Sequence, residues 1–356
     1  MKNILKLIRA VAFRNKPIYV HFGITSRCNL KCRMCNISLR EGKELSLKEI
    51  GKAFDFLKKL GVFYVSIGGG EPLLREDLAS VINLLGQKGF MVRLLTNGVL
   101  AKKNDIKNFV SAGLREVSVS LDTLNPKLQE YICNQKGVWE SIIESINLFA
   151  ELLPKKRNLL LINTTVSPLN IEELPELSRF AREKGCYISF IPIEDNGLDE
   201  FTFKQRHHQA IDKSYDCLIK IKEIKGNHIF NSALFLEKSR HYLKSKQRNW
   251  QCDAGKLYFS INPQGELSIC HRFNSRVSLL NPEIKNFLKS KEFKSERMNL
   301  INNCPGCMRP CWAEITFFLN DKKSFLELAH LEFFARFPQL KGLFVPNAYC
   351  ANNENI

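Results

Sequence analysis

Three cysteines stand within eight residues of one another, at Cys28, Cys32 and Cys35, in a CxxxCxxC spacing. Three thiolates on one short loop can hold a single soft metal centre. A closed tetrahedral site or a fully protein-ligated four-iron cluster needs four protein ligands. A site with three protein ligands keeps one position for a ligand that reacts. The triplet therefore predicts a reactive metal site more than a structural one.

A glycine-rich turn at 68–72 reads Gly-Gly-Gly-Glu-Pro and follows the apolar run 62–67. Glycine lets the backbone approach a ligand closely, and Glu71 adds a carboxylate at the same place. An ordinary turn between a strand and a helix is the alternative. It is the weaker alternative because the cysteine triplet lies one strand–helix unit upstream.

A second group of cysteines lies near the C-terminus. Cys252, Gly265 and Cys270 form a C-x12-G-x4-C pattern around a predicted hairpin with strands at 257–261 and 267–269. A CxxCxxxC run then follows, formed by Cys304, Cys307 and Cys311. A zinc site is the alternative for both groups, and the triplet would then need a fourth ligand such as His21.

The elements that position these motifs alternate in type along the chain. Short apolar runs predict strands at 18–24, 62–67, 90–95, 115–121, 159–166 and 187–191. Amphipathic stretches predict helices at 46–60, 75–88, 102–112, 138–152 and 171–185. This alternation favours a parallel α/β sheet, and six such units form most of a barrel whose reactive face is at the carboxyl ends of the strands. Both the triplet and the 68–72 turn follow a strand, so both are expected on that face.

We divide the chain into five segments. They are a basic amphipathic helix at 1–16, the partial barrel at 17–193, a helical connector at 194–251, a cysteine-rich unit at 252–312 and a helical tail at 313–356.

Composition narrows the compartment and the partners. Twelve cysteines in a long chain with metal-ligand spacings indicate a reducing compartment, so we expect a cytoplasmic protein. No apolar stretch is long enough to span a bilayer. The net charge of +17 favours anionic partners. No basic run is long or interleaved with aromatic residues, so solvated surface lysines explain the charge better than a nucleic-acid partner does.

Both ends of the chain have apolar residues at helical spacing, including Ile4, Leu5 and Leu7 at the start and Phe325, Leu328 and Leu331 in the tail. Packing on the barrel is the favoured interpretation. Peripheral contact with the anionic inner face of a membrane is the alternative, and it would suit a lipid-linked substrate.

The triplet after the first strand, followed by the Gly-Gly-Glu turn after the second, resembles the signature of the radical SAM superfamily. The resemblance implies a partial (βα)6 TIM-type barrel. It also implies a [4Fe–4S] cluster held by Cys28, Cys32 and Cys35, with S-adenosylmethionine chelating the fourth iron. Reductive cleavage of that cofactor would release a 5′-deoxyadenosyl radical, which abstracts hydrogen from a substrate C–H bond.

The resemblance also implies cofactor-binding residues. Glu71, with Gly69 and Gly70, would contact the methionyl amino group. Where the family usually has an aromatic residue beside adenine, this chain has Met34, whose flexible thioether can fill the same space. Further candidates at strand ends are Thr96, Asn97, Ser120, Asp122 and Asn163. Hydrogen bonds that satisfy a strand end are the alternative role for each of these.

The C-terminal cysteines resemble the SPASM/twitch extension of many radical SAM enzymes, which holds auxiliary iron–sulfur clusters. A full SPASM unit has a longer cysteine run, so this chain's inventory favours one auxiliary [4Fe–4S] cluster. Its ligands would be Cys252, Cys270 and two of Cys304, Cys307 and Cys311. That cluster would accept the product electron or anchor the substrate.

The resemblance implies an oxidoreductase or maturase that needs a reductant such as flavodoxin or ferredoxin. Peptide or protein modification is the first expectation for its substrate, and modification of a small molecule, sugar or membrane lipid is the second. Two other classes stay open, a non-catalytic iron–sulfur electron carrier and a zinc-stabilised nucleic-acid-binding protein. An electron carrier has no need of Glu71 and the glycines before it.

Overall fold

The computed structural model describes residues 16–35, 42–154, 158–194, 197–224, 226–273 and 277–336, with the side chains of 332–336 excepted. The amphipathic helix predicted at 1–16 lies outside these ranges apart from Lys16. The chain divides into two compact units, and each is described by itself. The first comprises the residues up to Thr96, Leu100–Val117 and Gln251–Cys304, and the second comprises Asn97–Val99, Ser118–Trp250 and the residues from Pro305 onward.

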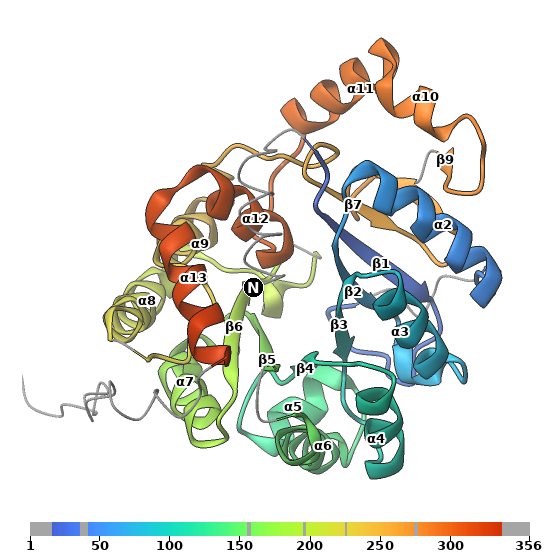
Figure 1. Ribbon diagram of the computed structural model, residues 1–356. Helices are drawn as coiled ribbons and strands as arrows, with labels where there is room; N and C mark the ends of the chain where they lie inside the picture. Colours follow the sequence, from blue (N-terminus) through green and yellow to red (C-terminus); the bar gives the residue numbers. More distant parts are fainter. Residues whose placement is uncertain are drawn as a thin grey trace, which may run out of the picture. The chain divides into compact units, whose positions relative to one another are not determined.

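Parallel strands and covering helices form the first unit (Figure 1). Its parallel strands are β1 (Tyr19–Thr25), β2 (Tyr64–Gly69), β3 (Met91–Thr96) and β7 (Tyr258–Ile261). The helices that follow β1, β2 and β3 are α2 (Leu47–Leu60), α3 (Leu78–Gln87) and α4 (Lys103–Ser111). These strands and helices occupy the positions predicted from the sequence, within three residues at each end.

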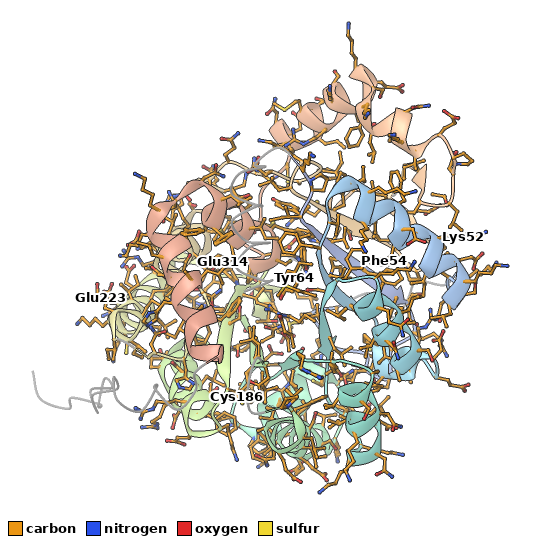
Figure 2. All side chains as sticks on the ribbon, in the orientation of Figure 1. Lys52, Phe54, Tyr64, Cys186, Glu223 and Glu314 are labelled. Carbon is orange, nitrogen blue, oxygen red and sulfur yellow. The ribbon has the colours of Figure 1, made fainter. Side chains whose placement is uncertain are left out.

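Helix α2 shows why the local sequence forms these elements. The Ser46 hydroxyl accepts a hydrogen bond from the Glu49 N–H, and the Glu49 carboxylate accepts one from the Ser46 N–H at 2.8 Å, which completes a capping box. Gly61 ends the helix in the left-handed conformation with φ 115°. Lys52 lies on its exposed face, whereas Phe54 points inward and contacts the ring of Phe22 on β1 at 5.4 Å (Figure 2).

The predicted cysteine-rich hairpin is present and joins the sheet of the first unit. β7 pairs with β8 (Glu266–Ser268) in an antiparallel arrangement, and β8 pairs with β9 (Val277–Ser278). β7 also pairs in parallel with β1, with Tyr258 opposite Tyr19. The sequence patterns predicted the hairpin but not this pairing. Two helices follow, α10 (Ile284–Lys289) and α11 (Lys291–Asn302).

The second unit pairs β5 (Leu159–Val166) with β6 (Tyr187–Pro192) in parallel. β4 (Glu116–Ser120) contributes residues to both units because the division falls within it. The helices of the second unit are α5 (Pro126–Cys133), α6 (Val138–Leu152), α7 (Leu174–Glu183), α8 (His208–Glu223), α9 (Ala233–Ser245), α12 (Pro310–Asn320) and α13 (Lys322–Arg336). The sequence analysis missed α5, which begins with Asn125 as its N-cap and Pro126 in its first turn.

Parallel strands with helices between them confirm the predicted α/β fold class and its partial-barrel type. In the first unit the carboxyl ends of β1, β2 and β3 are Thr25, Gly69 and Thr96. The site described next is built on these three strand ends, where βα proteins place their chemistry.

Candidate active site

Two glycines at the end of β2 lie against the backbone that leads into the cysteine loop. The Gly70 N–H donates to the Thr25 carbonyl at 2.8 Å, and the Glu71 N–H donates to the Arg27 carbonyl at 2.8 Å. A Cβ added to Gly69 would stand 2.3 Å from the Thr25 oxygen, and one added to Gly70 would stand 2.0 Å from the Arg27 oxygen. No side chain fits at either position, so the backbone contact explains both glycines.

Glu71 is fully buried, and its orientation is fixed by two donors. Its Oε1 accepts hydrogen bonds from the Leu73 N–H at 3.0 Å and from the Thr96 hydroxyl at 2.7 Å. Thr96 ends β3, so two neighbouring strand ends hold one carboxylate. The structure therefore brings together Gly69, Gly70, Glu71 and Thr96, four of the predicted cofactor-binding residues.

Glu44, which comes after the cysteine loop in the chain, is bonded to the segment that precedes the loop. Its carboxylate accepts hydrogen bonds from the Thr25 hydroxyl at 2.5 Å and from the Arg27 Nε at 3.0 Å. The buried guanidinium of Arg75 lies 3.6 Å from Glu44 and donates to the Leu45 carbonyl at 3.1 Å. The sequence analysis missed Glu44 and Arg75, because neither belongs to a motif and the contact joins residues 31 positions apart.

Arg75 is itself held in place by a second acid. Its guanidinium donates to both oxygens of Asp77 at 2.8 Å, and this hydrogen bonding lowers the pKa of the Asp77 carboxyl. Asp77 therefore stays ionised and keeps Arg75 aimed at the loop. Glycines therefore contact the segment before the cysteine loop, and charged groups hold the segment at Glu44 and Leu45 that comes after it.

Cys28, Cys32 and Cys35 lie on the loop that follows these contacts. Cys28 and Cys32 are partly exposed and Cys35 is exposed, and the Cys35 N–H donates to the Cys32 carbonyl at 3.0 Å. Across the residues that the structure describes, no three His, Cys, Asp or Glu side chains stand in a metal-holding arrangement. The donor set itself, three accessible thiols within eight residues, matches the ligands of an iron–sulfur cluster. His21, the zinc alternative's fourth ligand, lies earlier on β1, and its ring occupies the space beside Gly68.

The remaining predicted cofactor residues are not brought into one group. Met34 is partly buried on the cysteine loop, and Ser120 is exposed at the end of β4. The Asn97 side chain accepts a hydrogen bond from the Val99 N–H at 3.0 Å, which closes a local turn. Asn163 is partly buried in β5, and its carbonyl accepts from the Leu121 N–H. Their cofactor roles stay predictions.

Asp122 is hydrogen-bonded to other residues of the second unit. Its Oδ1 accepts from the Thr165 N–H at 2.7 Å, and its carbonyl accepts from the Asn170 amide at 2.7 Å. Burial raises the pKa of the Asp122 carboxyl to about 6, although the Thr165 hydrogen bond works in the opposite direction. These bonds join the strand end to β5, as expected of a residue that satisfies a strand end.

A glycine lies where the segments that carry Cys252 and Cys270 approach each other. Gly255, three residues after Cys252, adopts φ +70°, and a Cβ added to it would stand 3.2 Å from the side chain of Ile269. Ile269 directly precedes Cys270, so the absence of a side chain at Gly255 lets the two cysteine-bearing segments approach. Cys270 is buried, and Cys252 is partly exposed.

The CxxCxxxC run connects α11 to α12. Cys307 is buried, Cys304 and Cys311 are partly exposed, and Cys311 lies in the first turn of α12. In the second unit the Trp250 Nε1 donates to the Cys307 carbonyl at 3.3 Å. Gly306 adopts φ +95°, and a Cβ added there would stand 2.5 Å from the Arg248 side chain. Cysteine thiolates are the ligands that soft metal centres prefer, so the types of these five residues suit such a centre.

Part of the chain is similar to a known protein family. Residues 22–181 match the family model of the Radical SAM superfamily. A probable GTP 3′,8-cyclase of Methanocaldococcus jannaschii is 36% identical over 188 residues, and the alignment covers 49% of this chain and 60% of that protein. The GTP 3′,8-cyclase of Aquifex aeolicus is 33% identical over 196 residues, with 51% and 59% covered. The alignments thus span about three fifths of these curated relatives.

Solved structures share the fold. The Streptococcus suis protein SuiB bound to S-adenosylmethionine matches with a TM-score of 0.62 at 17% identity, over 83% of this chain and 72% of that one. Native anSMEcpe with bound AdoMet and a Cp18Cys peptide matches with a TM-score of 0.62 at 16% identity, over 92% and 98%. At these identities the likeness establishes the architecture.

Residues 22–181 are therefore similar to the radical SAM domain, and the fold agrees with this match. The two solved structures named above, SuiB and anSMEcpe, hold S-adenosylmethionine. Within the described residues, no helix is long and apolar enough to cross a bilayer.

Proposed function

We propose that the chain is a radical SAM enzyme whose first cluster is held by Cys28, Cys32 and Cys35. When bound, the cluster and S-adenosylmethionine supply reductive cleavage of the sulfonium and abstraction of hydrogen from a substrate C–H bond. One observation carries the proposal. Gly69 and Gly70 lie against the backbone of Thr25 and Arg27, so Glu71 is fixed beside the segment that leads into the three cysteines.

Each residue has a distinct task in this proposal. The three thiolates hold the metal, and Glu71 accepts a hydrogen bond from the cationic amino group of the methionyl moiety. Thr96 orients Glu71, because its hydroxyl donates a hydrogen bond to Oε1 of the Glu71 carboxylate. Glu44 and Arg75 hold the loop in register with the strand ends. A reductant such as flavodoxin or ferredoxin would deliver the electron.

The deciding experiment is anaerobic reconstitution with iron and sulfide, followed by dithionite and S-adenosylmethionine. We expect release of 5′-deoxyadenosine from the native chain and none from Cys32→Ala. A chain with a fully loaded cluster that releases none would refute the proposal. Zinc in place of iron and sulfide after anaerobic purification would favour the zinc-stabilised alternative.

Glu71→Gln tests the cofactor contact separately. The amide keeps a carbonyl oxygen for Thr96 but loses the charge that binds an ammonium group. We expect the KM for S-adenosylmethionine to rise about tenfold or more with unchanged iron content, since charged hydrogen bonds contribute roughly 1.5–3 kcal/mol. Glu49→Gln is the control, because Glu49 caps α2 and pairs with Lys43 and has no contact with Glu71 or Thr96 in the hydrogen bonds described. An unchanged KM in Glu71→Gln would remove this residue from the cofactor site.

For the substrate we propose a peptide or protein side chain. The fold match with peptide-bound anSMEcpe extends over 92% of this chain, and it includes the C-terminal part that the cyclase alignments, at about half of the chain, cannot fully cover. An auxiliary cluster on Cys252, Cys270 and two of Cys304, Cys307 and Cys311 belongs to the same proposal, as a twitch-like extension of the barrel.

A nucleotide is the second candidate, favoured by the GTP 3′,8-cyclase names of the relatives. Incubating the loaded enzyme with GTP and following the nucleotide by mass spectrometry separates the two candidates. Consumption of GTP together with 5′-deoxyadenosine release supports the nucleotide. Unchanged GTP, with cofactor cleavage stimulated by a peptide encoded beside the gene, supports the peptide.

A further inference from the structure

A buried tyrosine hydroxyl contacts the first of the C-terminal cysteines. The Tyr258 hydroxyl lies 3.2 Å from the Cys252 Sγ, within one compact unit. Tyr258 is fully buried, and its strand β7 pairs with β1 on one side and β8 on the other. The hydroxyl therefore has a fixed position, set by the sheet rather than by a mobile loop.

A tight turn returns Cys252 to this tyrosine. The Lys256 and Leu257 N–H groups both donate to the Asp253 carbonyl at 3.0 Å, and the Gly255 N–H donates to the Tyr258 carbonyl at 2.9 Å. The Arg297 Nε, from α11, donates to the Ala254 carbonyl and fixes the turn from outside. The backbone thus places the thiol over the phenol ring's polar end through several independent bonds.

The chemistry decides which group donates. A metal-bound cysteine is a thiolate without a proton, so it can only accept, whereas the phenol O–H can donate. Hydrogen bonds to cluster sulfurs stabilise the reduced, more negative form and so raise the reduction potential. We propose that Tyr258 donates a hydrogen bond to the Cys252 thiolate and raises the reduction potential of the auxiliary cluster. This inference rests on the proposed function, which makes Cys252 a cluster ligand.

Neighbouring tyrosines provide matched controls. Tyr19 stands opposite Tyr258 in the β1–β7 register and opposite Tyr64 in the β1–β2 register, so the three rings form one row across the sheet. The Tyr19 and Tyr64 rings are 5.7 Å apart, and the Tyr64 hydroxyl donates to Glu116 at 2.6 Å. Tyr19 is as buried as Tyr258. Tyr19→Phe therefore removes a hydroxyl from the same row while leaving the Cys252 contact in place.

The experiment uses the full-length chain with Cys28, Cys32 and Cys35 replaced by Ala, so that only the auxiliary cluster assembles. Three proteins are compared: this parent chain, the parent with Tyr258→Phe, and the parent with Tyr19→Phe. Each is reconstituted with iron and sulfide alone. Iron content is measured, and the midpoint potential is followed by electron paramagnetic resonance during a redox titration. Thermal melting of each protein verifies that it is folded.

We expect equal iron in all three proteins and a lower midpoint potential in Tyr258→Phe alone. In deuterated buffer, pulsed resonance should also detect one exchangeable deuteron near the cluster that disappears in Tyr258→Phe. A purely structural role for Tyr258 would change neither the deuteron signal nor the potential. Equal potentials with the deuteron retained would overturn the inference while leaving the auxiliary cluster intact. Absence of bound iron in the parent chain would overturn the proposed auxiliary cluster itself, and this inference with it.

Discussion

The two cysteine regions of this chain are built in different ways. The N-terminal triplet occupies eight residues, and the segment directly before them contacts Gly69, Gly70 and Glu44. The C-terminal cysteines are distributed over a turn, a hairpin and the start of a helix, between residues 252 and 311. A contiguous motif can be recognised from its spacing alone, whereas a dispersed ligand set depends on every element that carries a ligand.

The difference has a functional consequence. The triplet is surrounded by the strand ends that carry Glu71 and Thr96, so cofactor binding and metal binding share one support. Around Cys252 the described neighbours are instead a buried tyrosine and a backbone turn. The first region is equipped for a reacting ligand, and the second for holding a metal centre in a set environment. Four variants test this contrast.

The largest effect is expected for Gly70→Ala. A Cβ there would stand 2.0 Å from the Arg27 carbonyl oxygen, so the loop must move away from β2. We expect loss of the first cluster's iron and at least a roughly tenfold fall in 5′-deoxyadenosine release. Each increase of about 1.4 kcal/mol in the activation free energy lowers the rate by about that factor.

Gly86→Ala is the matched control, because a Cβ on Gly86 in α3 meets no atom within 4 Å. That variant should keep full activity and gain a little stability, as alanine favours helix over glycine. A Gly70→Ala chain that binds and cleaves the cofactor normally would show that the glycine contact is dispensable.

Cys270→Ala should separate the two regions. It removes one proposed ligand of the auxiliary cluster without touching the loop that carries the triplet. We expect about four fewer iron atoms per chain, the content of one cubane. Substrate-independent cleavage of S-adenosylmethionine should persist while substrate turnover is lost. If cofactor cleavage disappeared as well, the two cysteine regions would not be independent.

Thr96→Val should have a moderate effect confined to the first region. It removes one hydroxyl that orients Glu71 while keeping the shape of the side chain. A lost hydrogen bond of about 1 kcal/mol corresponds to roughly a fivefold higher KM for S-adenosylmethionine. Iron content should not change. Thr164→Val, which removes a hydroxyl bound only to the Leu121 carbonyl, is the control and should leave the KM unaltered.

The last effect concerns stability rather than activity, and it depends on pH and on the helix that carries Cys311. Burial raises the pKa of Glu314 on α12 to about 7, and its carboxylate accepts from the Ser232 N–H at 2.9 Å (Figure 2). Lys222, which lies 3.5 Å from Glu327, attracts the charged form of Glu314 and works against burial, whereas Glu327 repels it.

Because the folded pKa exceeds the unfolded one, the stability that Glu314 contributes is present at low pH and is lost as pH rises through about 7. Allowing for partial exposure, we expect roughly 1–2 kcal/mol. The melting temperature of the native chain should fall from pH 5 to pH 8 more steeply than that of Glu314→Gln. Parallel curves would show that Glu314 is ionised throughout.

Much of the molecule was predictable because its signals are local. The strands from β1 to β6 and the capping box at Ser46 follow from periodicity and helix-end chemistry over a few residues. Helix α5 was missed because it is only eight residues long and offers little periodicity. Among the predicted cofactor residues, Thr96 bonds to Glu71, whereas Asn97 closes its own turn and Asp122 bonds to Thr165 on β5.

The sequence by itself predicted a soft metal centre at the cysteine triplet and a radical SAM domain, because ligand spacing and strand–helix alternation are properties of short segments. Only the tertiary structure decided that Gly69 and Gly70 support the cysteine loop, that Glu44 and Arg75 close it, and that β7 lies beside β1 with Tyr258 against Cys252. These contacts join residues up to 239 positions apart, as in the pairing of Tyr19 with Tyr258. They depend on which strands become neighbours, and no local pattern encodes that choice.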